Sequence, residues 1–343
     1  MRAKLLDLEF AVPPYVIPQA QAASYAQKLF GGVRDICRML PVFANTGIDR
    51  RYSCAPIDWY LEPHGWVDRN ALYVESAVDL LEAVTRKLLA ATGLSADQLD
   101  SIVVVSTTGV ATPSLDALLV ERMDLRRDIQ RLPIFGLGCA GGVTGLSRAA
   151  AMARADPGSR VLFLVVELCA LSFRKDDASK SNIIASALFG DGAAGAILST
   201  EGEGPAIGAV GEHTWPDSLD IMGWDVEEDG LQARFAQSIP ALVARDFRTL
   251  LDGFLDRHDI DFADIDGFAC HPGGAKVLDA LEDALDLPRQ ALVDSRQVLR
   301  DFGNMSAATA LFVAGRMSLM GRRTLLTALG PGFSAAFLML EGR

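Results

Sequence analysis

The sequence Gly136-Leu137-Gly138-Cys139-Ala140-Gly141-Gly142 separates a short apolar run, residues 132–135, from an alanine-rich stretch, residues 143–154. This succession predicts a strand, a tight turn and a helix that begins just after Cys139. The unpaired N–H groups and the dipole of a first helical turn place partial positive charge near such a cysteine. Because that charge favours the nucleophilic thiolate, Cys139 is a candidate nucleophile. A small buried cysteine in a turn is the alternative.

Two further polar residues stand at related positions in the second part of the chain. His271 follows the apolar residues 267–270, in the position that Val105 occupies in an earlier apolar run, and Asn304 opens an alanine-rich stretch as Cys139 does. Both pairs are separated by about 165 residues. This spacing indicates an internal repeat of a whole set of strands and helices, too long for a solenoid.

The repeat predicts two halves that each alternate strands and helices and that pack with pseudo-twofold symmetry. Apolar runs at residues 160–166 and 323–329 extend it. We expect the boundary in the turn-rich residues 201–205, which gives halves of residues 1–204 and 205–343. Equivalent helix N-termini would then point to a shared centre, one presenting the cysteine and the other the asparagine.

Bulk composition excludes several classes of protein. The formal net charge of −12 and the absence of a Lys/Arg run argue against nucleic acid as the main partner. No stretch approaches the roughly 18 apolar residues of a membrane span, and the N-terminus lacks the apolar region of a signal peptide. Five scattered cysteines without a CxxC pair or a histidine cluster make a metal site unlikely. A reducing cytoplasmic location suits a working thiol.

Five motifs, in order and in register, resemble those of the type III polyketide synthases, the chalcone and stilbene synthase superfamily. They are LGCAGG around Cys139, ALFGDGAAGA at residues 187–196, HPGG at residues 271–274, GNMSAA at residues 303–308 and GPG at residues 330–332. The resemblance implies a thiolase-like α/β fold of two pseudo-symmetric αβαβα halves with mixed five-stranded sheets. It also implies a homodimer, coenzyme A thioesters as substrates, and no tightly bound cofactor.

Cys139, His271 and Asn304 together suit acyl transfer from a thioester. The sulfur attacks and holds the acyl group covalently, while the imidazole and the amide donate hydrogen bonds to the oxyanion. The same donors can stabilise the enolate that forms when a malonyl thioester loses carbon dioxide. A structural histidine and a helix-capping asparagine are the alternatives for each residue alone, but the resemblance implies catalytic roles for all three.

The resemblance also implies residues that shape the cavity. Phe189 matches a gatekeeper between the thiol and the coenzyme A tunnel, and a second aromatic gatekeeper is replaced near Ala233, where Phe235 could fill the gap. Four positions match residues that tune chain length and cyclisation, and a fifth lies near a cavity position; in order they are Thr107, Cys169, Ser172, Ser306 and Trp224. Arg50 and Arg51 could meet coenzyme A phosphates or form a solvated basic pair.

Residues 213–224 resemble the corresponding segment of bacterial and fungal alkylresorcinol and alkylpyrone synthases, which take long fatty acyl starters. Trp215, Met222 and Trp224 are apolar enough to line a tunnel, which we favour, or to fill a core. The expected reaction is therefore decarboxylative condensation of malonyl-CoA onto a fatty acyl-CoA starter held on Cys139, followed by cyclisation to an alkylpyrone or alkylresorcinol.

Two alternatives remain open at this point. A β-ketoacyl-ACP synthase that initiates fatty acid synthesis shares the Cys-His-Asn set but depends on a carrier protein. A catalytically silent homologue that only binds ligand is argued against by the intact set. Turnover of malonyl-CoA without a carrier protein excludes the first, and turnover that is lost in Cys139→Ala excludes the second.

Overall fold

A computed structural model describes residues 1–30 and 39–343, and within them nine strands form one mixed sheet. Five strands come from the first half of the chain; in spatial order they are β5 (Gln130–Ile134), β4 (Ser101–Val105), β6 (Val161–Leu168), β7 (Asp191–Ser199) and β1 (Lys4–Ala11). Four come from the second half; they are β8 (Ala206–Thr214), β13 (Ser334–Glu341), β12 (Arg323–Gly330) and β11 (Gly267–Cys270). The two sets meet at a single residue pair, Lys4 with Ala206.

The internal repeat is visible in how the strands pair. Strand β4 is parallel to β6, which is antiparallel to β7, and β11 is likewise parallel to β12, which is antiparallel to β13. Strands β6 and β7 are buried along their whole length, and β12 and β13 along all but their end residues. Their continuous apolar sequences are typical of strands that are covered on both faces.

The second set of strands has four members in the described chain, and the fifth that we expected is replaced by a helix. Strand β5 leads to Cys139, whereas helix α10 (Val293–Phe302) leads to Asn304. The sequence explains the difference, because Ser295, Val298 and Leu299 are buried at helical spacing and charged residues separate them.

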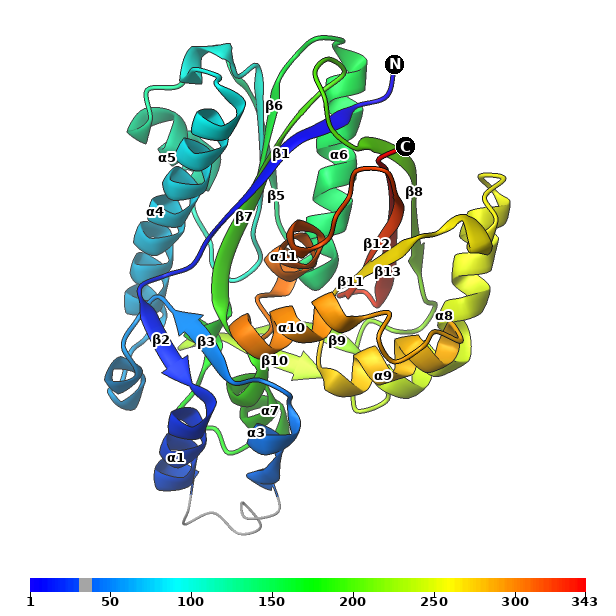
Figure 1. The fold of residues 1–343 in the computed structure, drawn as a ribbon. Coiled ribbons are helices and arrows are strands. Elements are labelled where there is room, and N and C mark those ends of the chain that lie inside the picture. Colours follow the sequence, from blue (N-terminus) through cyan, green and yellow to red (C-terminus); the bar gives the residue numbers. More distant parts are fainter. Residues whose placement is uncertain (31–38) are drawn as a thin grey trace.

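Helices form three layers around the strands (Figure 1). Helices α6 (Gly141–Ala155) and α11 (Thr309–Arg316) contact strands of both halves and therefore form the middle layer. Helices α4 (Trp66–Thr92) and α5 (Leu115–Arg122) cover the outer face of the first set of strands. Helices α8 (Ile239–Asp256) and α9 (Ala275–Ala284) contact each other and belong to the apolar core on the outer face of the second set. This is the αβαβα layering that the repeat predicts.

Shorter elements gather at one end of the molecule (Figure 1). Helices α1 (Gln19–Phe30), α3 (Pro41–Asn45) and α7 (Lys180–Leu188) contact one another there. Two small sheets and six single-turn helices complete the described chain; they are β2 (Tyr15–Pro18) with β3 (Arg50–Ser53), β9 (Met222–Glu227) with β10 (Gly230–Phe235), η1 (Ile57–Leu61), η2 (Ala96–Gln98), η3 (Gly138–Ala140), η4 (Cys169–Ser172), η5 (Phe262–Asp264) and η6 (Ser306–Ala308).

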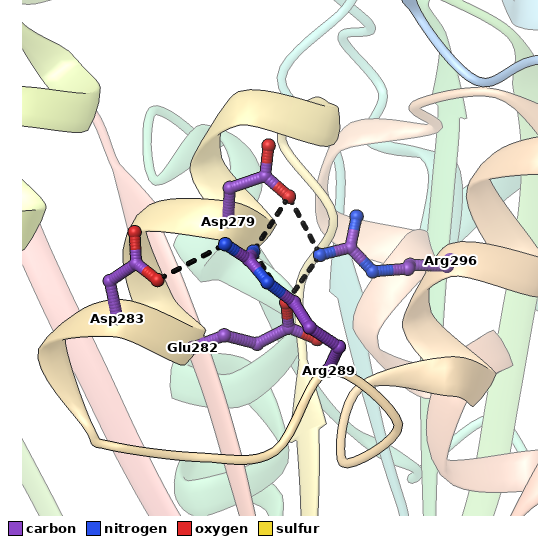
Figure 2. A network of polar contacts seen from close by, with 5 residues as sticks. All are labelled: Asp279, Glu282, Asp283, Arg289 and Arg296. Atoms are coloured by element: carbon purple, nitrogen blue, oxygen red, sulfur yellow. Dashed lines mark hydrogen bonds and ion pairs between the residues drawn. The ribbon is translucent and has the colours of Figure 1, made fainter.

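A network of ion pairs holds α9, α10 and the segment between them together (Figure 2). Glu282 of α9 is almost fully buried and contacts Arg289 at 3.1 Å and Arg296 of α10 at 2.5 Å. The same arginines contact Asp279, and Arg289 also contacts Asp283. Because α9 follows His271 and α10 precedes Asn304, this network fixes the relative positions of two candidate site segments.

Candidate active site

Cys139 lies in η3, between the end of β5 and the start of α6, as the sequence predicts. Gly138 has a φ of +47°, and a Cβ atom added to it would lie 2.5 Å from Cδ of Pro331. A Cβ atom on Gly330 would lie 2.6 Å from the carbonyl oxygen of Leu137. The segment that carries the GPG motif therefore packs directly against the cysteine turn, and glycines are required on both sides of this contact.

His271 follows β11 and is 5% exposed. Its backbone N–H donates to the carbonyl oxygen of Thr327 at 2.8 Å, which places the residue at the end of the sheet. Neither ring nitrogen, Nδ1 or Nε2, has a hydrogen-bond partner among the described residues. Since an unpaired buried polar group costs about 1–3 kcal/mol, this imidazole is poised for a ligand rather than for a structural contact.

Asn304 is fixed by its backbone and by one oxygen of its side chain. Its N–H donates to the carbonyl oxygen of Leu188 at 2.8 Å, and its own carbonyl oxygen accepts from the N–H of Gly190 at 3.0 Å. Oδ1 accepts from the N–H of Ser306 at 2.8 Å, which fixes the orientation of the amide. Nδ2 donates a long hydrogen bond of 3.4 Å to the carbonyl oxygen of Gly273, beside the histidine segment. The side chain therefore presents a donor, as an oxyanion site requires.

Cys139, His271 and Asn304 line one cavity of about 750 Å³. This volume lies within the range of about 300–1,000 Å³ typical of small-molecule sites. Most of its other lining residues are apolar or small, and they come from α3, α7, α8, α9 and β12. The structure thus brings the three predicted residues from both halves of the chain to a common chamber.

The middle layer allows this meeting because its two helical segments approach each other closely. A Cβ atom on Gly142 of α6 would lie 2.1 Å from the carbonyl oxygen of Ala307 in η6. A Cβ atom on Gly141 would lie 2.7 Å from Val105. Gly142 is therefore explained by packing between the two halves, and Gly141 by packing against β4 of its own half.

Burial opposes the thiolate that the position of Cys139 at a helix start favours. It raises the pKa of the Cys139 thiol to about 12 and lowers the pKa of His271 to about 3. A helix dipole supplies only about 0.3–1 kcal/mol in the other direction, whereas one pKa unit corresponds to about 1.4 kcal/mol. Desolvation therefore works against a thiolate–imidazolium pair in this cavity.

Glu167, which sequence reasoning missed, is a buried carboxyl group close to the cysteine. Its Oε2 accepts from the N–H of Thr107 at 3.0 Å and from Oγ1 of Thr108 at 2.9 Å, and the hydroxyl of Ser306 and the backbone of Ala307 also lower the pKa of this carboxyl group by hydrogen bonding. Burial raises the pKa of Glu167 to about 7. Its negative charge would raise the pKa of Cys139 further. A charged residue inside the apolar run of β6 was the available signal.

Phe189 lies in an aromatic cluster that separates two spaces. Its ring centroid is 5.7 Å from that of Trp224 and 5.5 Å from that of Phe235, and Ala233 packs in the same cluster. Phe189 and Cys169 line a second, apolar pocket of about 80 Å³ that extends toward α1. The aromatic cluster therefore stands beside a pocket that is separate from the main cavity.

The other predicted cavity residues lie either at the small pocket or beside the cysteine turn. Ser172 lines the small pocket together with Cys169, to whose carbonyl oxygen its Oγ donates at 2.7 Å. Thr107 supports the cysteine turn, because its Oγ1 accepts from the N–H of Gly138 at 3.1 Å. Ser306 is buried with a φ of +46° and hydrogen-bonds to the Cys139 thiol, which lowers the thiol pKa slightly against the effect of burial.

Two interpretations of the sequence are corrected by the side-chain positions. Trp215 belongs to the core: it packs against Phe333 and donates from Nε1 to Asp246 at 2.9 Å, whereas Met222 does line the main cavity. Arg51 is neither solvated nor placed to meet a phosphate at an exposed entrance, because it is 4% exposed and lies close to the buried Asp191.

Residues 1–30 and 39–343 contain no group of three His, Cys, Asp or Glu side chains arranged to hold a metal ion. No helix in these ranges has the length and hydropathy needed to cross a membrane. Cys54, Cys139, Cys169 and Cys270 are all buried free thiols, and Cys37 lies outside the described residues.

Comparisons with known proteins identify the family of this chain. The family model for the N-terminal domain of chalcone and stilbene synthases matches residues 63–202, and the model for the C-terminal domain matches residues 209–340. A putative chalcone synthase of Bacillus subtilis (strain 168) is 36% identical, over 99% of this chain and 98% of its own length. A 1,3,6,8-tetrahydroxynaphthalene synthase of Streptomyces peucetius subsp. caesius is 36% identical, over 96% of this chain and 91% of its own.

A comparison with solved structures leads to the same family. The crystal structure of 1,3,6,8-tetrahydroxynaphthalene synthase from Streptomyces coelicolor A3(2), a bacterial type III polyketide synthase, superposes with a TM-score of 0.94 at 29% identity. The match covers 98% of this chain and 99% of that one. This chain therefore belongs to the chalcone and stilbene synthase family, the type III polyketide synthases, which are acyltransferases that condense coenzyme A thioesters.

Proposed function

We propose that Cys139 carries a long-chain fatty acyl starter onto which malonyl-CoA units are condensed, and that the product closes to an alkylpyrone or alkylresorcinol. The observation that carries the catalytic part is the shared cavity of Cys139, His271 and Asn304. The same proposal includes the two halves of the chain. Residues 1–204 present the thiol, and residues 205–343 present the two hydrogen-bond donors.

The proposed loading step uses the neutral groups as they stand. The thiol of Cys139 attacks the carbonyl carbon of the starter thioester, and the unpaired imidazole of His271 takes the thiol proton in the same event. Nδ2 of Asn304 donates to the oxyanion. The tetrahedral intermediate then releases the coenzyme A sulfur, which takes the proton from His271, and the acyl group remains on Cys139.

The proposed extension step uses the same donors for a different anion. Malonyl-CoA loses carbon dioxide, and the electron pair of the broken bond becomes an enolate whose oxygen accepts hydrogen bonds from His271 and Asn304. The enolate carbon attacks the acyl group on Cys139, and the cysteine sulfur leaves as a thiolate. That thiolate attacks the thioester of the lengthened chain, and the coenzyme A sulfur leaves and takes a proton from solvent, so that the chain is held on Cys139 for another cycle.

The small apolar pocket supports the proposal of a fatty acyl starter. It lies on the far side of Phe189 and is lined by Ala22, Ala26 and Leu29 of α1. An alkyl chain that passes Phe189 would leave water and enter apolar surroundings, at a gain of about 0.8 kcal/mol for each buried methylene. The pocket holds about 80 Å³, so it would take the far end of a chain whose remainder occupies the main cavity.

The test is incubation of the purified protein with malonyl-CoA and, separately, acetyl-, benzoyl-, octanoyl- or lauroyl-CoA, without a carrier protein. Mass spectrometry of the products should show lauroyl-CoA as the preferred starter. Three relatives are 1,3,6,8-tetrahydroxynaphthalene synthases, so an incubation with malonyl-CoA alone is included. A main product from malonyl-CoA alone, or a preference for acetyl- or benzoyl-CoA, would contradict the proposed starter.

Single substitutions test the roles of the catalytic residues and of the small pocket. Cys139→Ala should abolish turnover, and Asn304→Ala should lower malonyl-CoA decarboxylation by about 10²–10³-fold. Ala26→Leu should fill the small pocket and move the preference from lauroyl- to octanoyl-CoA. Ala20→Leu, on the exposed face of the same helix, is the matched control and should leave the preference unchanged.

We also propose that the chain forms a homodimer. An apolar groove on α4 and α5, lined by Trp66, Val67, Val74 and Leu118, supports this proposal, because Val67 is 78% exposed. Sedimentation equilibrium should give twice the chain mass of 36.7 kDa, and Val67→Asp should shift the protein toward the chain mass. A wild-type protein that sediments as a single chain would contradict the dimer.

A further inference from the structure

A buried arginine lines the small apolar pocket beside Phe189. Arg51 is 4% exposed, and its Nη1 atom has no hydrogen-bond partner among residues 1–30 and 39–343. Burial lowers the pKa of Arg51 only to about 10, so the guanidinium is charged at neutral pH. A buried charged donor is costly unless it is hydrogen-bonded. A purely hydrocarbon occupant of this pocket would leave that donor unpaired.

The stem of Arg51 is held between two motif segments of the active site. A Cβ atom on Gly190 would lie 3.1 Å from Cβ of Arg51, and one on Gly303 would lie 3.3 Å from the same atom. Gly190 follows Phe189 and Gly303 precedes Asn304, and the backbones of Phe189 and Asn304 form a bridge with each other. The stem is therefore packed tightly where the two segments meet, which leaves the guanidinium little freedom to turn to another partner.

Other polar groups at this pocket have hydrogen-bond partners already. Asp191, whose negative charge acts on Arg51, accepts from the backbone N–H groups of Cys54 and Ala170, both at 2.8 Å. Several hydroxyl groups of the lining are also hydrogen-bonded to nearby protein groups; they belong to Tyr25, Tyr60, Ser172 and Ser186. An occupant that brings one hydrogen-bond acceptor would therefore satisfy Nη1 of Arg51 without displacing an existing contact.

The charges near this pocket favour a neutral acceptor over an anion. Burial raises the pKa of Asp191 to about 6, so its carboxylate balances the guanidinium of Arg51 at pH values somewhat above neutral. A carboxylate on the ligand would place a second negative charge in the same buried region, which is costly. A hydroxyl or keto oxygen accepts the hydrogen bond and adds no charge, and a hydroxyl group takes about the space of a methyl group.

We propose that Arg51 binds a neutral oxygen atom at the far end of the acyl chain, so that the enzyme selects chains that carry a hydroxyl or keto group there. The inference rests on the proposed function, since it takes the chain on Cys139 to pass Phe189 and to enter the small pocket. A chain with a methyl end leaves Nη1 unpaired, whereas a chain with an oxygen at that point forms a hydrogen bond to a charged donor.

The first test measures binding without turnover. The wild-type protein is titrated calorimetrically with octyl, decyl and dodecyl thioethers of coenzyme A, each ending in a methyl or a hydroxyl group. At the length that reaches Arg51, the hydroxyl-ended ligand should bind about 10-fold more tightly or better. Equal or weaker binding of the hydroxyl-ended ligand at all three lengths would overturn the proposal. Tighter binding of a carboxyl-ended ligand would also overturn it, because the pocket would then select an anion.

The second test assigns the preference to Arg51. Arg51→Met keeps an apolar stem and removes the donor, so the methyl-ended thioether should become the tighter ligand. Arg51→Lys keeps a charged donor and should still favour the hydroxyl-ended ligand, and it serves where the methionine variant does not fold. Arg50→Met is the matched control, because Arg50 is the exposed neighbour on β3, and it should keep the wild-type ratio of the two affinities. A folded Arg51→Met protein with the wild-type ratio would contradict the proposal.

The two proposals fail in different ways. If the proposed starter and product are wrong, the product panel changes while the thioethers still show a preference that depends on Arg51. If the role of Arg51 is wrong, condensation with fatty acyl starters proceeds, and the hydroxyl-ended thioethers bind no better than the methyl-ended ones.

Discussion

Replacement of Glu167 by glutamine tests the description of the site interior most directly. Glu167 is fully buried in β6, and its Oε2 accepts from the backbone of Thr107 and the hydroxyl of Thr108. Glutamine has nearly the same shape, and its amide oxygen can accept both hydrogen bonds. The substitution therefore removes one titratable group from the interior and leaves the packing of the interior largely intact.

The magnitude follows from the pKa of Glu167, which burial raises from an ordinary value of 4.5 to about 7. Because the folded state binds this proton more tightly than the unfolded state does, the stabilisation is fully present below pH 4.5. It declines as the pH rises toward 7, and above that the wild type has lost about 3.4 kcal/mol relative to acid conditions. Glu167→Gln has no such loss.

The assay is urea unfolding of both proteins at pH 5 and pH 8.5. From pH 5 to pH 8.5, the difference in free energy of unfolding between Glu167→Gln and the wild type should change by about 2.5 kcal/mol in favour of the variant. Asp191, whose pKa burial raises to about 6, titrates in both proteins and cancels in the difference. A difference between the two proteins that is the same at both pH values would refute the reasoning.

Two further predictions concern the contacts that hold the halves and the site segments in place. Gly142→Ala should destabilise the protein by about 2 kcal/mol or more and lower turnover, because the new Cβ meets a backbone oxygen at 2.1 Å. Gly253→Ala, in α8 with only an arginine side chain nearby, should instead raise the melting temperature, so equal effects would contradict the packing argument. Arg296→Met should lower the free energy of unfolding by about 1–3 kcal/mol, because buried Glu282 keeps only Arg289 (Figure 2). An unchanged unfolding curve would show that the network contributes nothing.

Much of the fold was predictable because its signals are local or periodic. Continuous apolar runs identified β4, β6 and β12, and the repeat of these runs at a fixed offset indicated the pseudo-symmetric pairing. The same offset related Cys139 to Asn304, and the structure places both, with His271, on one cavity. These inferences needed the order and spacing of residue types but no distances.

Other features depend on contacts that no local pattern encodes. Glu167 meets Thr107 because β6 lies beside β4 in a particular register, and the sequence of β6 alone contains no trace of that neighbour. Trp215 was taken for a tunnel residue because an apolar side chain is equally suited to a core. The fifth strand of the second half was expected from the family resemblance, yet the residues before Asn304 have helical periodicity, which is a local signal in this sequence.

The burial of the site has a consequence for catalysis. Desolvation that disfavours a charged Cys139 and a charged His271 also strengthens any hydrogen bond formed inside the same cavity, because both effects come from the low local dielectric constant. A neutral imidazole and the fixed amide of Asn304 are dipolar donors that need no counter-ion at rest. They gain most when negative charge develops on a substrate oxygen. Such a cavity does not have to stabilise charged side chains before the reaction begins. Its hydrogen-bond donors therefore act mainly on the oxyanion and the enolate of the proposed reaction.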